Sequence, residues 1–402
     1  MPYLSDRIEL IRISPIRMIA ALLDKARASR SIISFGGGAP SLPPPRELLE
    51  EIENLIREKP IKALGYCGTR GLPELRNLIA EDLKKYTGVE YDGEKEIMIT
   101  DGSTEGIFLT FLSILNKNDE VILIDPTYLG YTEPIKLAGG RIVRIPAKVE
   151  NGYQPDPEDL KNSVTKRTRA FVLLSPDNPT GRVISREFVK TLVDLAQEHD
   201  FWIIYDGAYQ HIVYEGENTW PQSYPGAKEY TISVHTFSKE ASIPGLRVGY
   251  VAAPKEVISA MEKLKQYTSL APNTFAQYAL LKFYENGVKE RYLRDVVIPT
   301  YKSRRDLMGE LIRKYLPEAR TITPHGAFYF FVDIRPYLEL MGRNDKEFAS
   351  RLLYRKEVVV IPGSYFGSMG NGHVRMTFVS EPEERIKEGI ERIWEFVFSY
   401  TI

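Results

Sequence analysis

The feature that most constrains this 402-residue chain is a series of short apolar strands separated by stretches of helix length. The strands are nearly continuous apolar runs, a pattern typical of strands that are buried on both faces of a sheet. Strands that alternate with helices form a mostly parallel sheet covered by helices on both sides. The predicted strands are 97–100, 121–125, 142–146, 171–174, 201–206, 231–235 and 247–252. The sequence therefore predicts an α/β fold with a mostly parallel seven-stranded sheet between helices.

Polar side chains follow three consecutive strands of this predicted sheet. Asn178 follows one strand, Asp206 ends the next with Tyr209 close behind, and Lys239 follows the third. Functional groups gather at the carboxyl ends of parallel strands. A lysine held there can form a Schiff base with a carbonyl if its pKa is lowered. Each residue also has an ordinary use: an exposed lysine, a helix-capping Asp206 or a turn-forming Asn178.

Taken together, these residues carry a resemblance to a known family. The run Asn178-Pro179-Thr180-Gly181, then Asp206 with Tyr209, then Ser238-Lys239 with Arg247, is similar to pyridoxal-phosphate-dependent aminotransferases. The resemblance is to fold type I, class I/II, including the aspartate, aromatic, kynurenine and aminoadipate enzymes. It covers essentially the whole chain, and the order and spacing of the set are far more specific than any one piece.

The resemblance implies pyridoxal 5'-phosphate as cofactor and a role for each of these residues. Lys239 would form the Schiff base and carry protons, and Asp206 would hold the proton of the pyridine nitrogen by a charge-assisted hydrogen bond. Asn178 and Tyr209 would donate to the phenolic oxygen, and Arg247 would bind the phosphate as a fixed cation. Lys239, Asp206 and Tyr209 are the predicted catalytic residues.

Further cofactor contacts are predicted from the same resemblance and from helix physics. Ser103 or Thr104 is expected to cap a helix after strand 97–100, and the N-terminus of that helix would attract a phosphate. Tyr128 lies where the family places an aromatic side chain on the pyridine ring. Tyr66 resembles a tyrosine that reaches across a homodimer interface to the partner's cofactor phosphate, which implies shared active sites. Thr236 and Ser238 complete the predicted cofactor contacts.

The substrate-binding residues are predicted to be Gly38, Asn178, Arg375 and Arg17. Arg375 resembles the arginine that grips the α-carboxylate, a task that suits a guanidinium because it binds in bidentate fashion. Gly38 would contact the substrate through its backbone. Arg17 resembles a mobile arginine of the kynurenine and aminoadipate aminotransferases that faces the substrate side chain, and Pro15 would fix the start of its helix. An exposed arginine on an amphipathic helix is the alternative.

Composition excludes several other classes of function. The 53 basic and 54 acidic residues give a net charge of −1, which argues against a nucleic-acid or membrane-surface protein. The single cysteine, Cys67, excludes an intramolecular disulfide and fits a reducing compartment. The five histidines show no metal-binding spacing, so no metal is expected. No segment has the apolar length of a signal peptide core or a membrane span, and a cytoplasmic location is predicted.

The chain is predicted to form a large cofactor-binding domain and a smaller α/β domain. Residues 46–290 would form the large domain, and the N-terminal segment 1–45 would join residues 291–402 in the small domain. Strands are expected at 327–334, 358–361 and 374–378, and a long helix at 292–315 would link the two domains.

The predicted activity is transfer of an amino group from an L-amino acid to a 2-oxo acid, with 2-oxoglutarate as the expected acceptor, by a ping-pong mechanism. Broad, aromatic or aminoadipate-type donors are expected. The alternative enzyme is a β-lyase (C–S lyase), which would share every cofactor residue. The non-enzyme alternative is an aminotransferase-like transcription regulator.

Overall fold

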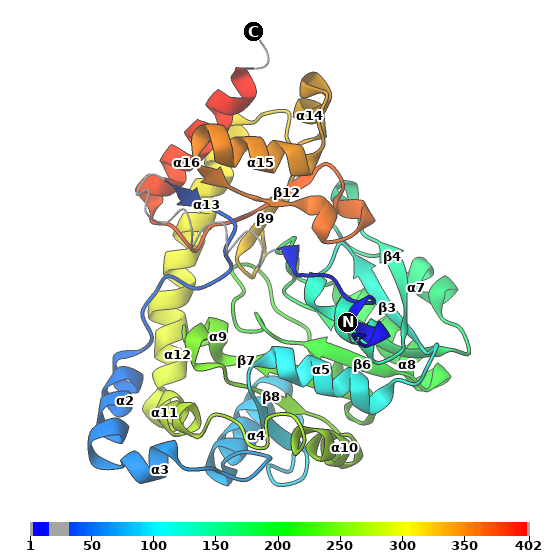
Figure 1. The fold of residues 1–402 in the computed structure, drawn as a ribbon, viewed down its shortest axis with the longest axis vertical. Helices are drawn as coiled ribbons and strands as arrows, with labels where there is room; N and C mark the ends of the chain where they lie inside the picture. Colours follow the sequence, from blue (N-terminus) through cyan, green and yellow to red (C-terminus); the bar gives the residue numbers. More distant parts are fainter. Residues whose placement is uncertain (1–2, 16–31, 400–402) are drawn as a thin grey trace.

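A seven-stranded sheet forms the centre of the molecule. The computed structural model describes residues 3–15 and 32–399, and the sheet has the order β2-β8-β7-β6-β5-β3-β4 (Figure 1). Its strands are β2 (Ile97–Thr100), β3 (Glu120–Asp125), β4 (Arg141–Pro146), β5 (Thr168–Leu174), β6 (Trp202–Asp206), β7 (Thr231–Thr236) and β8 (Gly249–Ala252). Neighbouring strands are parallel except that β8 runs antiparallel to both β2 and β7. The predicted fold class is confirmed.

Helices cover both faces of this sheet. They include α5 (Ser103–Ile114), α7 (Pro157–Ser163), α8 (Arg186–His199) and α10 (Lys255–Lys265). On one face, Phe188 and Leu192 of α8 belong to the same buried cluster as Phe171 of β5. On the other face, Phe111 of α5 packs in the cluster that contains Val172. Alternate residues of one strand thus face opposite helical layers, which is why the strand is apolar throughout.

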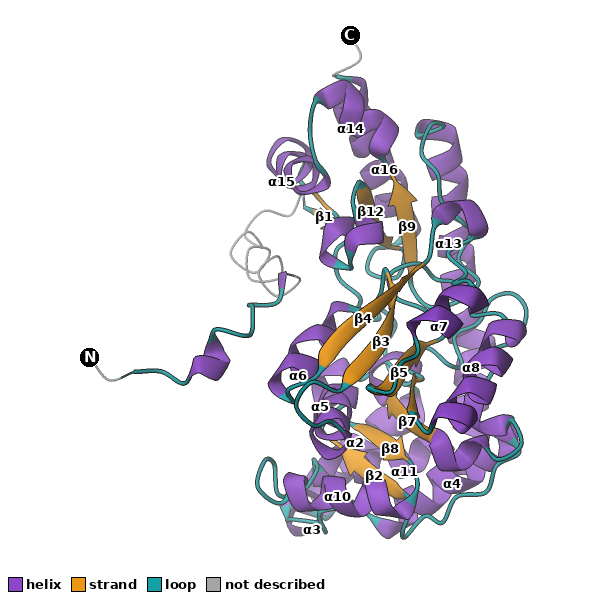
Figure 2. Ribbon diagram, turned by 90° about the vertical axis from the view of Figure 1, so that its right-hand side faces the viewer, coloured by secondary structure: helices purple, strands orange, loops and turns teal. Residues whose placement is uncertain are grey.

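A second group of strands lies beyond the carboxyl end of the main sheet. It consists of an antiparallel sheet with the order β11-β12-β9 and a parallel pair, β1 with β10. The strands are β1 (Ile33–Ser34), β9 (Tyr329–Asp333), β10 (Val358–Val359), β11 (Ile361–Pro362) and β12 (His373–Thr377). The predicted single strand 358–361 was wrong, because the chain changes sheet at Val360. Helices α13 (Ile298–Tyr315), α15 (Asp345–Lys356) and α16 (Glu383–Phe398) pack with these strands (Figure 2).

The helix predicted at 292–315 is helical over its whole length, with a π-helical turn at Leu293–Val297 between α12 and α13. Helix α11 begins at Thr274, where the Asn273 side chain accepts the N–H of Ala276. The remaining helices are α2 (Arg46–Glu58), α3 (Pro60–Leu64), α4 (Pro73–Thr87), α6 (Thr132–Leu137), α9 (Phe237–Glu240), α11 (Thr274–Tyr284), α12 (Val288–Tyr292) and α14 (Arg335–Met341). Over residues 3–15 and 32–399, none of the helices has both the length and the apolar character that crossing a membrane requires.

One carboxylate fastens the loop between β11 and β12 to the main sheet. Asp125, at the end of β3, is 2% exposed and accepts hydrogen bonds from the Ser368 N–H at 2.9 Å, the Ser368 hydroxyl at 2.8 Å and the Met369 N–H at 3.2 Å. Gly367 precedes them with φ +139°, and a Cβ there would lie 1.9 Å from Asp125 Oδ1. The close approach of loop and carboxylate therefore requires glycine at this position.

Candidate active site

A cavity of about 1080 Å³ opens at the carboxyl edge of the main sheet, facing the smaller sheet. It is lined by nearly all of the residues predicted to form the site: Gly38, Ser103, Thr104, Tyr128, Asn178, Asp206, Tyr209, Thr236, Ser238, Lys239, Arg247 and Arg375. Two predicted residues are not among them. Tyr66 is 89% exposed on the surface of the single chain, and Arg17 lies outside the described residues.

Lys239 occupies the short helix α9 that follows β7. Thr236 begins this helix, because its hydroxyl oxygen accepts the Ser238 N–H at 3.2 Å. The Lys239 ammonium donates to the Gly38 carbonyl at 2.8 Å. Burial, followed by the nearby guanidinium groups of Arg375 and Arg247, lowers the pKa of Lys239 to about 8. About a tenth of the amine is then in the neutral, nucleophilic form at pH 7, far more than for an ordinary lysine.

Asp206 is a buried acid at the end of β6. Its Oδ2 accepts the hydroxyl of Tyr131 at 2.7 Å, and its Oδ1 accepts the N–H of Ala208 at 3.0 Å. Burial raises the pKa of Asp206 to about 6, against the opposing effect of these hydrogen bonds. A carboxylate that stays partly desolvated in this way is well suited to hold a proton on a basic ring nitrogen. Tyr131 was not predicted as part of the site.

Hydrogen-bond donors converge at the end of the cavity near α5. Arg247 Nη1 lies 3.5 Å from the Ser238 hydroxyl, and Arg247 Nη2 lies 3.4 Å from the Asp101 carbonyl. The expected capping of α5 by Ser103 or Thr104 was wrong. Gly102 is the N-cap, with φ +79°, and no side chain caps the helix. A Cβ on Gly102 would lie 2.3 Å from Arg247 Nη2, so the arginine takes the space that a larger capping residue would need. The uncapped helix N-terminus and the guanidinium together favour an anion.

A buried guanidinium lies at the other end of the cavity. Arg375, in the middle of β12, is 2% exposed; its Nη1 donates to Asn178 Oδ1 at 3.0 Å and its Nη2 donates to the Gly36 carbonyl at 2.6 Å. Among the described residues its Nε has no hydrogen-bond partner. The Arg375 side chain therefore retains a charge and a donor with which to bind a carboxylate.

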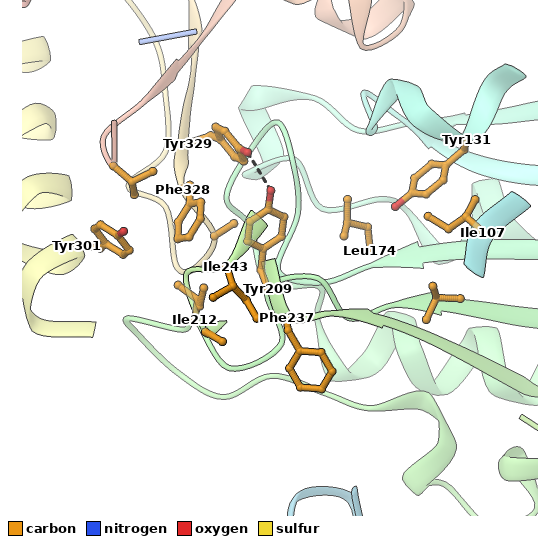
Figure 3. Close-up of a cluster of buried hydrophobic side chains, with 14 of the residues drawn as sticks. Ile107, Tyr131, Leu174, Tyr209, Ile212, Phe237, Ile243, Tyr301, Phe328 and Tyr329 are labelled. Carbon is orange, nitrogen blue, oxygen red and sulfur yellow. Dashed lines mark hydrogen bonds between the residues drawn. The ribbon is translucent and has the colours of Figure 1, made fainter. Parts of the chain in front are cut away.

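Two tyrosine hydroxyls meet between these two ends. The hydroxyls of Tyr209 and Tyr329 are 2.8 Å apart, and Figure 3 shows them directed at each other within a cluster of buried apolar side chains. Tyr128 lines the same cavity and packs edge-on against Tyr131, with 5.4 Å between ring centroids. Tyr329 was predicted only as a strand residue, because an aromatic side chain in an apolar strand is usually part of the core.

An amine with a lowered pKa, a buried acid and a guanidinium at each end of one cavity are the groups expected of an enzyme that acts on amines. The chain belongs to the class I and II aminotransferases: the family model for "Aminotransferase class I and II" matches residues 30–393. The protein is a transaminase and moves an amino group from an amino acid to a 2-oxo acid. The β-lyase and the transcription regulator are not favoured.

Relatives support this assignment over the full length of the chain. The aspartate aminotransferase of Pyrococcus horikoshii is 34% identical over 391 residues, which cover 97% of this chain and 96% of that protein. Aromatic-amino-acid aminotransferase 2 of Thermococcus litoralis is 34% identical over 393 residues, 97% of each chain. The structure of the Thermus thermophilus aspartate aminotransferase with maleate superimposes with a TM-score of 0.91 at 32% identity, over 98% of this chain and 100% of that chain.

Proposed function

We propose that this aminotransferase uses pyridoxal 5'-phosphate, bound in the cavity between the two sheets. Members of the family use this cofactor, and the residues present fit it. The fit rests on Asp206, a buried acid that forms no ion pair with an arginine within residues 3–15 and 32–399 and accepts hydrogen bonds there from one phenol and one backbone N–H. Asp206 would hold the pyridine nitrogen, and Asn178 and Tyr209 would donate to the phenolic oxygen.

The phosphate and the ring are assigned to the remaining cavity residues. Arg247, with the hydroxyls of Thr236 and Ser238, would hold the phosphate at the N-terminus of α5, near Ser103 and Thr104. Tyr128 would stack on the ring, and Tyr66 would reach the phosphate of the partner subunit. When bound, the cofactor supplies a carbonyl carbon for amine exchange and an electron sink for the charge left on the substrate.

The protein's own residues bind the amino acid and move its proton. Arg375 would bind the α-carboxylate, while Asn178 and the Gly38 backbone fix its orientation. Lys239 Nζ lies in the same cavity and can remove the proton from the substrate Cα, because its lowered pKa makes the neutral amine accessible. The first oxo acid leaves before the second binds, so we expect ping-pong kinetics.

The single observation that carries this proposal is the convergence of Lys239, Asp206 and Arg375 on one cavity. We expect turnover to fall by at least about 10²–10⁴-fold in Lys239→Ala. Loss of the proton carrier alone accounts for a fall of this size, and the nucleophile is lost as well. Borohydride reduction followed by peptide mass spectrometry should find a cofactor-modified peptide in the wild type and none in the variant. Lys255→Ala, at an exposed lysine, is the control and should react like the wild type. A Lys239→Ala enzyme that keeps about a tenth of wild-type turnover would refute the assignment.

The proposed substrates are an L-amino acid donor of broad, aromatic or aminoadipate type and 2-oxoglutarate as acceptor. Relatives named for aspartate and for aromatic amino acids support a site that accepts both acidic and apolar side chains. Initial rates of the purified enzyme with a panel of amino donors and 2-oxoglutarate test this range.

We also propose a homodimer with shared active sites and a two-domain organisation. The pairing of β1 with β10 supports the assignment of residues 1–45 and 291–402 to one small domain and of residues 46–290 to a large one. The cytoplasmic location stays a prediction from composition.

A further inference from the structure

Tyr329 and Tyr209 come from different sheets, and their hydroxyls form one buried hydrogen bond. Tyr329 is the first residue of β9 and Tyr209 follows β6; they are 2% and 4% exposed, with 2.8 Å between the hydroxyl oxygens (Figure 3). A hydrogen bond between hydroxyls on two packed, buried rings restrains the direction of both. The position of the Tyr209 hydroxyl therefore depends on Tyr329.

Tyr329 is itself held on two further sides by groups of the active site. The Arg375 guanidinium carbon lies 4.4 Å from the centre of the Tyr329 ring, a cation–π contact. The backbone of Gly38 passes directly against the Tyr329 hydroxyl, where a Cβ would lie 2.1 Å from the oxygen. The same Gly38 accepts the Lys239 amine through its carbonyl. Tyr329 is thus fixed between the carboxylate-binding arginine and the backbone that receives the lysine.

The number of protons decides what this contact can do. A phenolic hydroxyl has one proton to donate and can accept through its oxygen. Burial holds the pKa of Tyr209 well above its usual range, so that its proton is retained. When Tyr329 donates to the Tyr209 oxygen, the Tyr209 proton is left free to point into the cavity. Without that donor, nothing in this contact prevents Tyr209 from turning its proton away.

We propose that Tyr329 is a positioning residue of the aminotransferase reaction: its hydroxyl donates to Tyr209 and directs the Tyr209 proton toward the phenolic oxygen of the bound cofactor. This inference rests on the role proposed above for Tyr209. Tyr329 would not contact the phenolic oxygen itself. It would orient Tyr209, which does.

The test is the pH midpoint of the absorbance change of the bound cofactor, measured on the purified holoenzyme. A donor to the phenolic oxygen stabilises its anionic form, so losing the donor raises the midpoint. We expect Tyr329→Phe to raise it by roughly 0.4–1 pH unit, the size of one neutral hydrogen bond. Tyr209→Phe should raise it by at least as much. The absorbance per subunit in the same samples reports that each variant has folded and retained cofactor.

A double-mutant cycle separates positioning from a direct effect. If Tyr329 acts through Tyr209, the shift caused by Tyr329→Phe disappears when it is made in the Tyr209→Phe background. The same shift in both backgrounds overturns the inference, as does no shift from Tyr329→Phe when Tyr209→Phe shifts the midpoint. If Tyr209→Phe leaves the midpoint unchanged, the proposed role of Tyr209 fails and the inference falls with it.

A third buried tyrosine of the same cluster provides the matched control. The Tyr301 hydroxyl accepts the Leu42 N–H at 3.4 Å and does not line the cavity. Tyr301→Phe removes a buried hydroxyl without touching Tyr209, so the midpoint should stay at its wild-type value. An equal shift from Tyr301→Phe would show that the loss of any hydroxyl in this cluster moves the midpoint, and would overturn the inference.

Discussion

Burial of the Asp206 side chain makes the stability of the protein depend on pH. Burial raises its pKa to about 6 in the folded protein, whereas an aspartate in an unfolded chain titrates near pH 4. Between roughly pH 4 and 6 the folded protein therefore holds a proton that the unfolded chain has released. The free energy of unfolding must fall as pH rises through this window, because the unfolded state binds fewer protons.

Asp206→Asn removes this titration from the cofactor-free protein. We expect the stability of the variant relative to wild type to grow by about 1–2 kcal/mol between pH 5 and pH 7, since one pKa unit corresponds to about 1.4 kcal/mol. Urea unfolding of the cofactor-free proteins at several pH values in this range measures the difference. A difference that does not change with pH would show that Asp206 does not titrate as its burial requires. Transamination by the variant should be strongly reduced, because an amide carries no charge to hold a protonated ring nitrogen.

A second residue-scale prediction concerns the substrate side chain. Among the described residues that line the cavity, the only lysine or arginine side chains are Lys239, Arg247 and Arg375, and each has a proposed role. The distal carboxylate of an acidic substrate therefore needs a cation from elsewhere, and Arg17 is our candidate. Arg17→Ala should cost roughly 2–5 kcal/mol in kcat/KM for glutamate or 2-aminoadipate, with little loss for phenylalanine or leucine. Equal losses for acidic and apolar donors would show that Arg17 does not read the side chain.

The sequence predicted those site residues that can be recognised from their immediate neighbours in the chain. Lys239 and Asp206 lie at the ends of apolar strands, and both line the cavity as the strand pattern requires. Tyr131 and Tyr329 were missed because their partners are remote: Tyr131 is 75 positions from Asp206, and Tyr329 is 120 positions from Tyr209. No local pattern distinguishes a tyrosine that will find such a partner from one that only fills the core.

At the scale of elements, the existence and type of the helices and strands were predicted better than the residues at which they begin and end. The predicted strands of the main sheet are confirmed. A continuous apolar segment between helices is stable when both of its faces are buried inside the sheet. The cap of α5 and the strand at 358–361 were wrong for a shared reason. Gly102 makes room for Arg247, and Val360 lies where the chain passes from one sheet to another. Both depend on neighbours that only the folded chain brings together.

The loop anchored by Asp125 gives an element-scale prediction. Gly367→Ala should lower the free energy of unfolding by at least about 3 kcal/mol, because the new methyl group displaces a buried carboxylate from its hydrogen bonds. Gly152→Ala is the matched control: its φ is also positive, at +67°, but a Cβ would meet nothing within 4 Å. The control should lose only about 1–2 kcal/mol from backbone strain. Urea unfolding of both variants measures the difference, and similar losses would contradict a specific clash with Asp125.

At the scale of the whole molecule, apolar side chains on the surface are consistent with an interface. Ile61, Leu64, Tyr66 and Tyr267 are large and exposed in the single chain. Monomeric proteins rarely expose large contiguous apolar patches, and α3 supplies two of these residues next to Tyr66 in the chain. These exposed residues fit the proposal that Tyr66 lies at a contact between two subunits.

We expect the protein to sediment as a dimer at assay concentration. The Tyr66→Phe variant should retain the cofactor more weakly and should remain a dimer. Loss of one hydrogen bond to a charged group costs roughly 1.5–3 kcal/mol, or about 10–100-fold in cofactor dissociation constant. Equilibrium dialysis of the cofactor and analytical ultracentrifugation measure the two quantities. Tyr354→Phe, which alters an exposed tyrosine of α15 outside this group, is the control for the loss of a surface hydroxyl. A fully active, cofactor-saturated monomer would refute the shared site.

The reversed direction of β8 has a consequence for how such chains can vary. Thr236 and Gly249 are paired across β7 and β8, so the segment 237–248 is closed at both ends by the sheet. That one segment carries both Lys239 and Arg247. An inserted or deleted residue cannot be absorbed by sliding one strand along the other, because a slip of one residue would turn its side chains to the opposite face. Related chains should therefore keep the length of segment 237–248, and with it the separation of Lys239 and Arg247, so gaps in this segment should be rare.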